Sequence, residues 1–178
     1  MDDGFLVRQV LAGQRDAFRQ LVLRYQRPVF RFLGLLGVRP AAVEDVAQET
    51  FLRAFRHLAD FDPRRARFST WLFTIARRLA INEGQRAHNR VEVAEIEPAV
   101  DQHADASGQL IERERAARLR RALARLPVRL RAALVMVQME GLSLDEVATV
   151  EGCAVGTIKS RAFRARQLLR DALTKENG

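Results

Sequence analysis

Near the C-terminal end of the chain, two cations, a hydroxyl and an aromatic ring recur at intervals of three and four residues. They belong to Lys159, Ser160, Phe163 and Arg164. This spacing places all four side chains on one face of a helix. In the major groove of DNA, a guanidinium can fork onto a guanine and a ring can pack against a thymine methyl. The pattern therefore predicts a DNA-reading face, and a solvated basic helix packed on its neighbour is the alternative.

The surrounding residues predict a helix-turn-helix that presents this face. Ser143 is a typical N-cap, and Glu146, three residues later, completes a capping box. Gly152 permits the sharp turn before the second helix. The apolar residues of that helix recur at core spacing: Val155, Ile158, Ala162, Ala165 and Leu169. Its remaining predicted DNA contacts, the last two of them at phosphates, are Thr157, Arg161 and Arg166.

The composition of the 178-residue chain agrees with binding to nucleic acid. Its net charge is +8, and of its 30 basic residues only Lys159 and Lys175 are lysine. Arginine binds phosphate bidentately and stacks on bases, although a GC-rich genome explains the same bias because arginine has GC-rich codons. The single Cys153 excludes an internal disulfide and fits a cytoplasmic protein. The chain starts without a long apolar run, so we expect neither a signal peptide nor membrane insertion.

Charge divides the chain into three segments. Residues 91–112 carry six acidic and no basic side chains, whereas residues 1–90 and 113–178 are both net positive. The middle segment contains Pro98 and Gly108 and lacks a sustained helical period, which is typical of a linker. Both flanks show apolar residues at spacings of three and four without a strand-like alternation. The sequence therefore predicts an all-α protein, with two small helical domains joined by an acidic flexible linker.

The N-terminal segment predicts three helical stretches before its loop. Asp16 is expected to cap the first, Pro28 to begin a second apolar turn, and Gly37 with Pro40 to break the chain before the third. The third carries one apolar stripe, expected to be buried: Val46, Ala47, Thr50, Phe51, Ala54, Phe55 and Leu58.

The opposite face of this third helix is acidic near its start. The helix dipole explains Glu44 and Asp45 if they lie in the first turn, but it explains Gln48 and Glu49 less well. In a basic domain, the group Asp45, Gln48 and Glu49 suits docking to a positive protein surface.

Residues 58–71 are expected to form a loop in which arginines are interleaved with aromatic rings. Cations that follow phosphates beside rings or pockets that accept bases are typical of sites for unstacked bases. The predicted nucleic-acid contacts of this loop are Phe61, Arg64, Arg65, Arg67 and Phe68. Alternatively, the rings of Phe68 and Trp71 are core anchors. On the following helix, polar side chains are expected to face mostly outward and to extend this site: Thr74, Arg77, Arg78, Asn82 and Arg86.

Four segments resemble bacterial sigma factors of the small, two-domain extracytoplasmic-function (ECF) type in the sigma-70 family. They are DVAQETFLRAF (45–55), FSTWLFTIARRLA (68–80), LPVRLRAALVM (126–136) and the helix-turn-helix (140–170). Their order, with a linker between the second and third, is that of the family. The resemblance implies a protein that binds core RNA polymerase and promoter DNA to initiate transcription. It also implies that an anti-sigma factor is a partner. We expect no cofactor.

The resemblance assigns a role to each group of residues. Asp45, Gln48 and Glu49 match the surface for the polymerase clamp helices, and the loop from Phe61 to Phe68 matches the pocket for a flipped −10 base. The face around Lys159 matches the −35 reader. A spacer of about 17 base pairs separates the two promoter elements by roughly 58 Å, at ~3.4 Å per pair. The linker charge either helps the linker follow a basic path in polymerase or only keeps a spacer soluble.

Two other classes of protein explain less of the chain. A helix-turn-helix regulator that acts without polymerase accounts for residues 113–178, but not for the acidic face or the arginine–aromatic loop. An enzyme is not favoured, and we predict no catalytic residue and no metal site. The three histidines are scattered, and Asp60 and Asp62 are typical turn residues.

Overall fold

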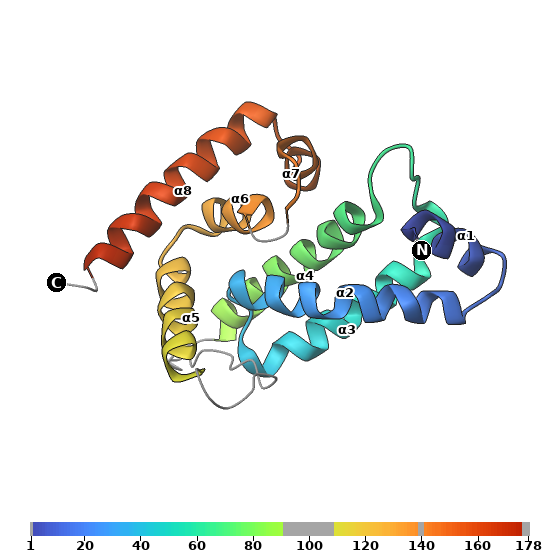
Figure 1. The fold of residues 1–178 in the computed structure, drawn as a ribbon, viewed down its shortest axis with the longest axis horizontal. Helices are drawn as coiled ribbons and strands as arrows, with labels where there is room; N and C mark the ends of the chain where they lie inside the picture. Colours follow the sequence, from blue (N-terminus) through green and yellow to red (C-terminus); the bar gives the residue numbers. More distant parts are fainter. Residues whose placement is uncertain (1, 91–108, 139–140, 176–178) are drawn as a thin grey trace.

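The computed structural model describes residues 2–90, 109–138 and 141–175. These residues form α-helices and one 3-10 turn, without a strand, which confirms the predicted all-α class (Figure 1). The elements are α1 (Asp3–Leu11), α2 (Asp16–Leu35), α3 (Pro40–Arg56), η1 (Leu58–Asp60), α4 (Phe68–Arg90), α5 (Gln109–Ala124), α6 (Val128–Gln138), α7 (Leu144–Glu151) and α8 (Val155–Lys175). Most of the predicted linker lies outside the described residues. Helix α5 begins at Gln109, so its first four residues belong to the predicted linker.

The N-terminal half is a bundle in which α2, α3 and α4 pack on one another and α1 packs against α2 (Figure 1). Its centre is the fully buried ring of Phe32, which meets the ring of Phe73 edge to face at a centroid distance of 4.9 Å. Leu21, Val29 and Leu33 of α2 are also fully buried and belong to the same core. This core holds α3 and α4 in place, and these two helices carry most of the predicted N-terminal contacts.

The predicted start and interruption of α2 are wrong. Asp16 is the first residue of α2 rather than its cap, and Arg15 in the N-cap position makes no side-chain capping bond. The helix also continues through Pro28 without a break. A proline inside a helix costs about 3 kcal/mol, but buried residues on both sides of it, such as Leu21 and Phe32, pack into the same core and offset this cost.

The α3 helix begins earlier than its acidic residues imply. Pro40 occupies its first turn, and no acidic residue lies there. The dipole explanation for Glu44 and Asp45 is therefore wrong, since the dipole acts within the first turn. The predicted stripe is buried except for Phe55, which is 40% exposed and packs edge to face on Phe18. The acidic face of α3 needs an explanation other than helix stability.

The C-terminal half contains the predicted helix-turn-helix. The hydroxyl of Ser143 accepts from the Glu146 backbone N–H, the Glu146 carboxylate accepts from the Ser143 backbone N–H, and both bonds of the capping box are present. Gly152 ends α7 in the left-handed region, at φ 62° and ψ 40°, a conformation that favours glycine. On α8, Ile158, Ala162 and Ala165 are fully buried, where the helix packs on α6 and α7. The capped turn fixes the direction in which α8 presents its other face.

The two halves touch each other. Helix α7 packs on α4, and the C-terminal half also contacts α2 through α5 and α6 (Figure 1). Most of the buried side chains of both halves form one continuous cluster.

Candidate nucleic-acid interface

The outer face of α8 presents the predicted −35 group to solvent. Lys159, Ser160, Phe163 and Arg164 are all exposed, and Phe163 is 61% exposed. This ring is the most exposed of the large apolar side chains in the described part of the chain. The face therefore combines hydrogen-bond donors with one apolar contact, which is the chemistry that distinguishes base edges.

The two predicted phosphate contacts on α8 have different surroundings. Arg161 donates from Nη1 to Oε2 of Glu151 at 3.0 Å, and its side chain is only 19% exposed. Arg166 is exposed, and its Nε donates to the carbonyl of Ala162 at 3.3 Å. The side chain of Thr157 is half-buried. Arg166 is thus open to a phosphate as the helix stands, whereas Arg161 is held by a carboxylate.

This arrangement predicts different consequences for two arginine substitutions on α8. Arg164→Ala should relax base preference at one promoter position and cost ~1–3 kcal/mol there, because a guanidinium on a guanine edge carries sequence information. Arg166→Ala should weaken binding to all sequences by similar amounts. A binding screen over promoter variants separates the two results. Equal relaxation in both variants would contradict the assignment of faces.

The turn after η1 is organised by Asp62. Its Oδ1 accepts from the Arg64 backbone N–H at 3.0 Å and from Arg64 Nε at 3.1 Å. These bonds with Arg64, together with the charge of Arg65, hold the pKa of the Asp62 carboxyl below its usual value. The side chains of Arg64 and Arg65 are 89% and 87% exposed. The loop therefore presents two cations to solvent on a turn that its own carboxylate stabilises.

The aromatic rings of this loop form an anchor beneath it. Phe61 and Phe68 meet edge to face at 5.8 Å, and both lie against Trp71. Tyr25 closes the cluster from α2, with its ring centroid 5.6 Å from that of Phe68. Phe61 is 8% and Phe68 2% exposed. These two rings offer little open surface for stacking, so in this arrangement they position the arginines.

The polar side chains of α4 divide into a free group and an engaged group. Arg78 and Asn82 are exposed. The hydroxyl of Thr74 donates to the carbonyl of Thr70 at 2.8 Å, within the helix. Arg77 forms an ion pair with Glu151 and is only 16% exposed, contrary to the outward orientation predicted for it. Arg86 belongs to α4, but its side chain lies outside the described residues.

The acidic face of α3 is open to solvent. Asp45 and Gln48 are exposed, whereas Glu49 is partly exposed and accepts from Arg53 Nε at 2.6 Å. That hydrogen bond is the main cause that lowers the pKa of Glu49. Leu52, which follows Gln48 by one helical turn, is 42% exposed and was missed from the sequence. The sequence did carry a signal for its exposure, because Leu52 falls outside the apolar stripe that was expected to be buried. This face of α3 thus presents one apolar and two acidic side chains, and acidic side chains complement a positive protein surface.

Sequence reasoning also missed a group of contacts between α7 and the N-terminal half. Glu146 accepts from Arg67 Nη2 at 2.9 Å and from the Thr70 hydroxyl at 2.6 Å. Burial alone would raise the pKa of the Glu146 carboxyl, but hydrogen bonds from Thr70 and Ser143 and the charge of Arg67 together lower it. The carboxylate is therefore ionised at neutral pH while it holds Arg67.

Comparison with known proteins identifies both halves of the chain. The family model described as Sigma-70 region 2 matches residues 21–90, and that of Sigma-70 region 4 matches residues 116–169. The RNA polymerase sigma-H factor of Pseudomonas aeruginosa is 35% identical over 181 residues, covering 96% of this chain and 93% of that relative. The chain belongs to the sigma-70 family. It is a sigma factor of the ECF type, and as such it binds core RNA polymerase and directs transcription from promoters.

Other relatives and solved structures agree. The ECF RNA polymerase sigma-E factor of Escherichia coli is 33% identical over 179 residues, covering 95% of this sigma factor and 93% of that relative. CnrH, solved with the cytosolic domain of CnrY, superposes with a TM-score of 0.74 at 29% identity, over 97% of each chain. RpoE of Bartonella quintana, solved with the anti-sigma factor NepR, superposes with a TM-score of 0.70 at 27% identity, over 88% of this chain and 96% of that one. The regulator without polymerase binding is not favoured, because it leaves the region 2 match unexplained.

The described part of the chain contains neither a cluster of metal-ligating side chains nor a membrane-spanning helix. No three side chains among its His, Cys, Asp and Glu residues cluster so that they could hold a metal ion. None of its helices combines the length and the apolar character that crossing a bilayer requires. Sigma factors as a family are not enzymes.

Proposed function

We propose that this sigma factor divides its task among three surfaces. The polymerase-docking face comprises Asp45, Gln48 and Glu49 on α3. The −10 site comprises the loop arginines Arg64, Arg65 and Arg67 above their aromatic anchor, together with the polar side chains of α4. The −35 reader is the outer face of α8. The observation that carries this proposal is the charge of these surfaces, since one acidic face and two basic ones lie on separate elements of one chain. Acidic residues suit a basic protein partner, and basic ones suit DNA.

An anti-sigma factor is the proposed regulator. RpoE of Bartonella quintana was solved with an anti-sigma factor, and CnrH with the cytosolic domain of CnrY, and this sigma factor resembles both over most of its length. We also propose that it acts in the cytoplasm, where transcription takes place, and that it contributes binding rather than catalysis.

The −10 assignment is tested by the two most exposed arginines of the loop. Replacing Arg64 and Arg65 with alanine should leave binding to core polymerase unchanged. It should weaken capture of the −10 single strand by roughly 1.5–3 kcal/mol, the range for a hydrogen bond to a charged group. Permanganate reactivity of unpaired thymines measures the open complex and should fall.

The matched control replaces the same two residues with lysine, which keeps the positive charges and the bond from the residue 64 backbone N–H to Asp62. This variant should melt promoters nearly as well as the parent. Full permanganate reactivity in the alanine variant would show that the loop is only a solvated turn.

A further inference from the structure

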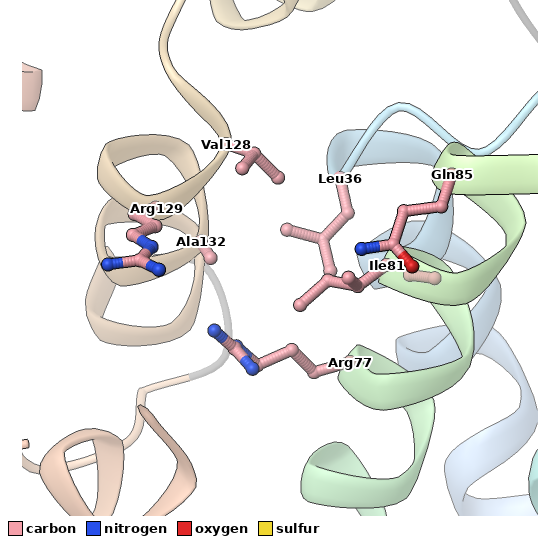
Figure 2. A pocket seen from close by; sticks show the side chains of 8 residues that line it. Leu36, Arg77, Ile81, Gln85, Val128, Arg129 and Ala132 are labelled. Carbon is pink, nitrogen blue, oxygen red and sulfur yellow. The ribbon is translucent and has the colours of Figure 1, made fainter. Parts of the chain in front are cut away.

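A cleft of about 390 Å³ lies between α4 and the end of α2 on one side and the start of α6 on the other (Figure 2). Three of its lining residues, Leu36, Ala80 and Ala132, are buried members of the hydrophobic cluster that joins both halves. Ile81 and Val128 line it with more open apolar surface, and Val128 is 47% exposed. The core therefore holds the inner side of the cleft in place, and its volume falls in the range of small-molecule sites, roughly 300–1,000 Å³.

The polar lining of the cleft is cationic. It consists of Arg77, Gln85 and Arg129, and none of the described residues that line the cleft is acidic. Arg77 projects from α4 toward α6 and shares the carboxylate of Glu151 with Arg161, so one negative charge compensates two positive ones. Arg129 is exposed and forms no ion pair with a carboxylate in the described part of the chain. The cleft thus carries positive charge that its described surroundings do not neutralise.

A third guanidinium adds to the positive charge beside the cleft. Arg131 precedes the lining residue Ala132, and a Cβ at Gly37, which follows the lining residue Leu36, would lie only 2.8 Å from its Nη1. The Nε of Arg131 is buried without a hydrogen-bond partner among the described residues, and burial lowers the pKa of the guanidinium. Positive charge gathered in a cleft with apolar walls attracts anions.

We infer that this cleft binds a small organic anion in which one negatively charged headgroup is joined to an apolar body. The headgroup pairs with the cations of the lining, and the body covers Ile81 and Val128. A nucleotide fits less well, because Gln85 is the only uncharged polar side chain among the described lining residues. The polar groups of a base and a sugar would then be buried without partners. A bare inorganic anion would leave the apolar walls uncovered.

This site goes beyond the proposed function and does not rest on it. Ile81 belongs to α4 and Val128 to α6, so one ligand would contact both halves of the chain at once. A ligand that needs both helices for binding stabilises the arrangement in which they face each other, and it does so in proportion to its concentration and affinity. The cleft would therefore allow a small molecule to influence the conformation of this sigma factor.

Two fluorescent probes that differ in one charged group test the inference on the full chain. Anilinonaphthalene sulfonate carries a sulfonate on its aromatic rings, and phenylnaphthylamine has the same rings without the sulfonate. The sulfonate probe should bind at a single site and more tightly than the uncharged probe. Fluorescence titration at constant ionic strength measures the stoichiometry and both affinities.

Substitutions at exposed lining residues separate the roles of charge and apolar surface. Arg129→Ala should weaken binding of the sulfonate probe about tenfold, the scale of a hydrogen bond to a charged group. It should leave binding of the uncharged probe unchanged. Val128→Ser should weaken binding of both probes, because both cover this side chain with their rings. Arg170→Ala is the matched control, since it removes the same charge from an exposed position of α8 outside the cleft. Circular dichroism verifies that each variant keeps the helical content of the parent.

Equal affinity of the sulfonate probe for the parent, Arg129→Ala and Val128→Ser would overturn the inference, because the probe would then bind elsewhere. An equal loss of affinity in Arg129→Ala and Arg170→Ala would overturn it too, since only the net charge of the chain would matter. Displacement of the sulfonate probe by inorganic phosphate at constant ionic strength would show that the site needs no apolar body, and it would exclude the proposed class of ligand.

Discussion

Replacing Asp45 and Glu49 with arginine is expected to abolish binding to core RNA polymerase while the helical content of the chain stays unchanged. Asp45 is exposed and Glu49 partly exposed on α3, where the helix dipole gives no reason for acidic residues. Losing one partner of a charge pair that is desolvated in an interface costs about 2–5 kcal/mol, and reversing the charge adds repulsion. Two such losses move a tight complex beyond detection in a binding titration with labelled core polymerase.

The structure indicates how to control this experiment. Glu49 is bonded to Arg53 at 2.6 Å, and an arginine at residue 49 would face that cation one turn away. Like charges at this spacing destabilise a helix by only about 0.2–0.5 kcal/mol, so the variant should remain folded. Reversing Asp145 and Asp171 instead adds the same charge to the other half and should leave affinity for polymerase intact. Unchanged affinity in the α3 variant would exclude this face as the docking surface.

Phe32→Ala is expected to have the largest effect on stability. The ring is fully buried and packs edge to face on Phe73 in the centre of the N-terminal bundle. Truncating a buried phenylalanine costs about 3–5 kcal/mol, a large part of the ~5–15 kcal/mol that stabilises a typical domain. Urea unfolding followed by circular dichroism measures the change in the free energy of unfolding.

Phe163→Ala is the matched comparison, since it removes the same ring from a position that is 61% exposed. It should leave the free energy of unfolding nearly unchanged and weaken binding to −35 DNA. Together the two variants separate a ring that builds the fold from a ring that reads DNA. A similar loss of stability in both would contradict the assigned orientation of α8.

Local signals in the sequence predicted the helix-turn-helix well. The capping box of Ser143 and Glu146 and the left-handed Gly152 are interactions between near neighbours, so residue types and spacing suffice to find them. The same holds for α8, where the buried Ile158 and Ala162 leave Lys159 and Phe163 exposed. Helical periodicity alone separates these two faces.

The sequence-based predictions were wrong where packing between residues far apart in the chain determines the structure. Pro28 was expected to start a new turn, but burial on both sides carries α2 through it. Phe55 belongs to an apolar stripe by spacing, yet the bundle leaves its ring 40% exposed. The pairing of Arg77 with Glu151 joins residues 74 positions apart and leaves no trace in local periodicity. Such contacts depend on how the two halves meet, which spacing along the chain does not encode.

Run-off transcription measures directly whether this sigma factor initiates transcription with core polymerase. Core RNA polymerase is supplied with promoter DNA selected by sequencing of bound fragments, with and without this chain. A defined transcript is expected only when the chain is present, and it should disappear when Asp45 and Glu49 are both replaced by arginine. Tight binding of the chain to duplex DNA, with no transcript and no affinity for core polymerase, would contradict initiation through polymerase.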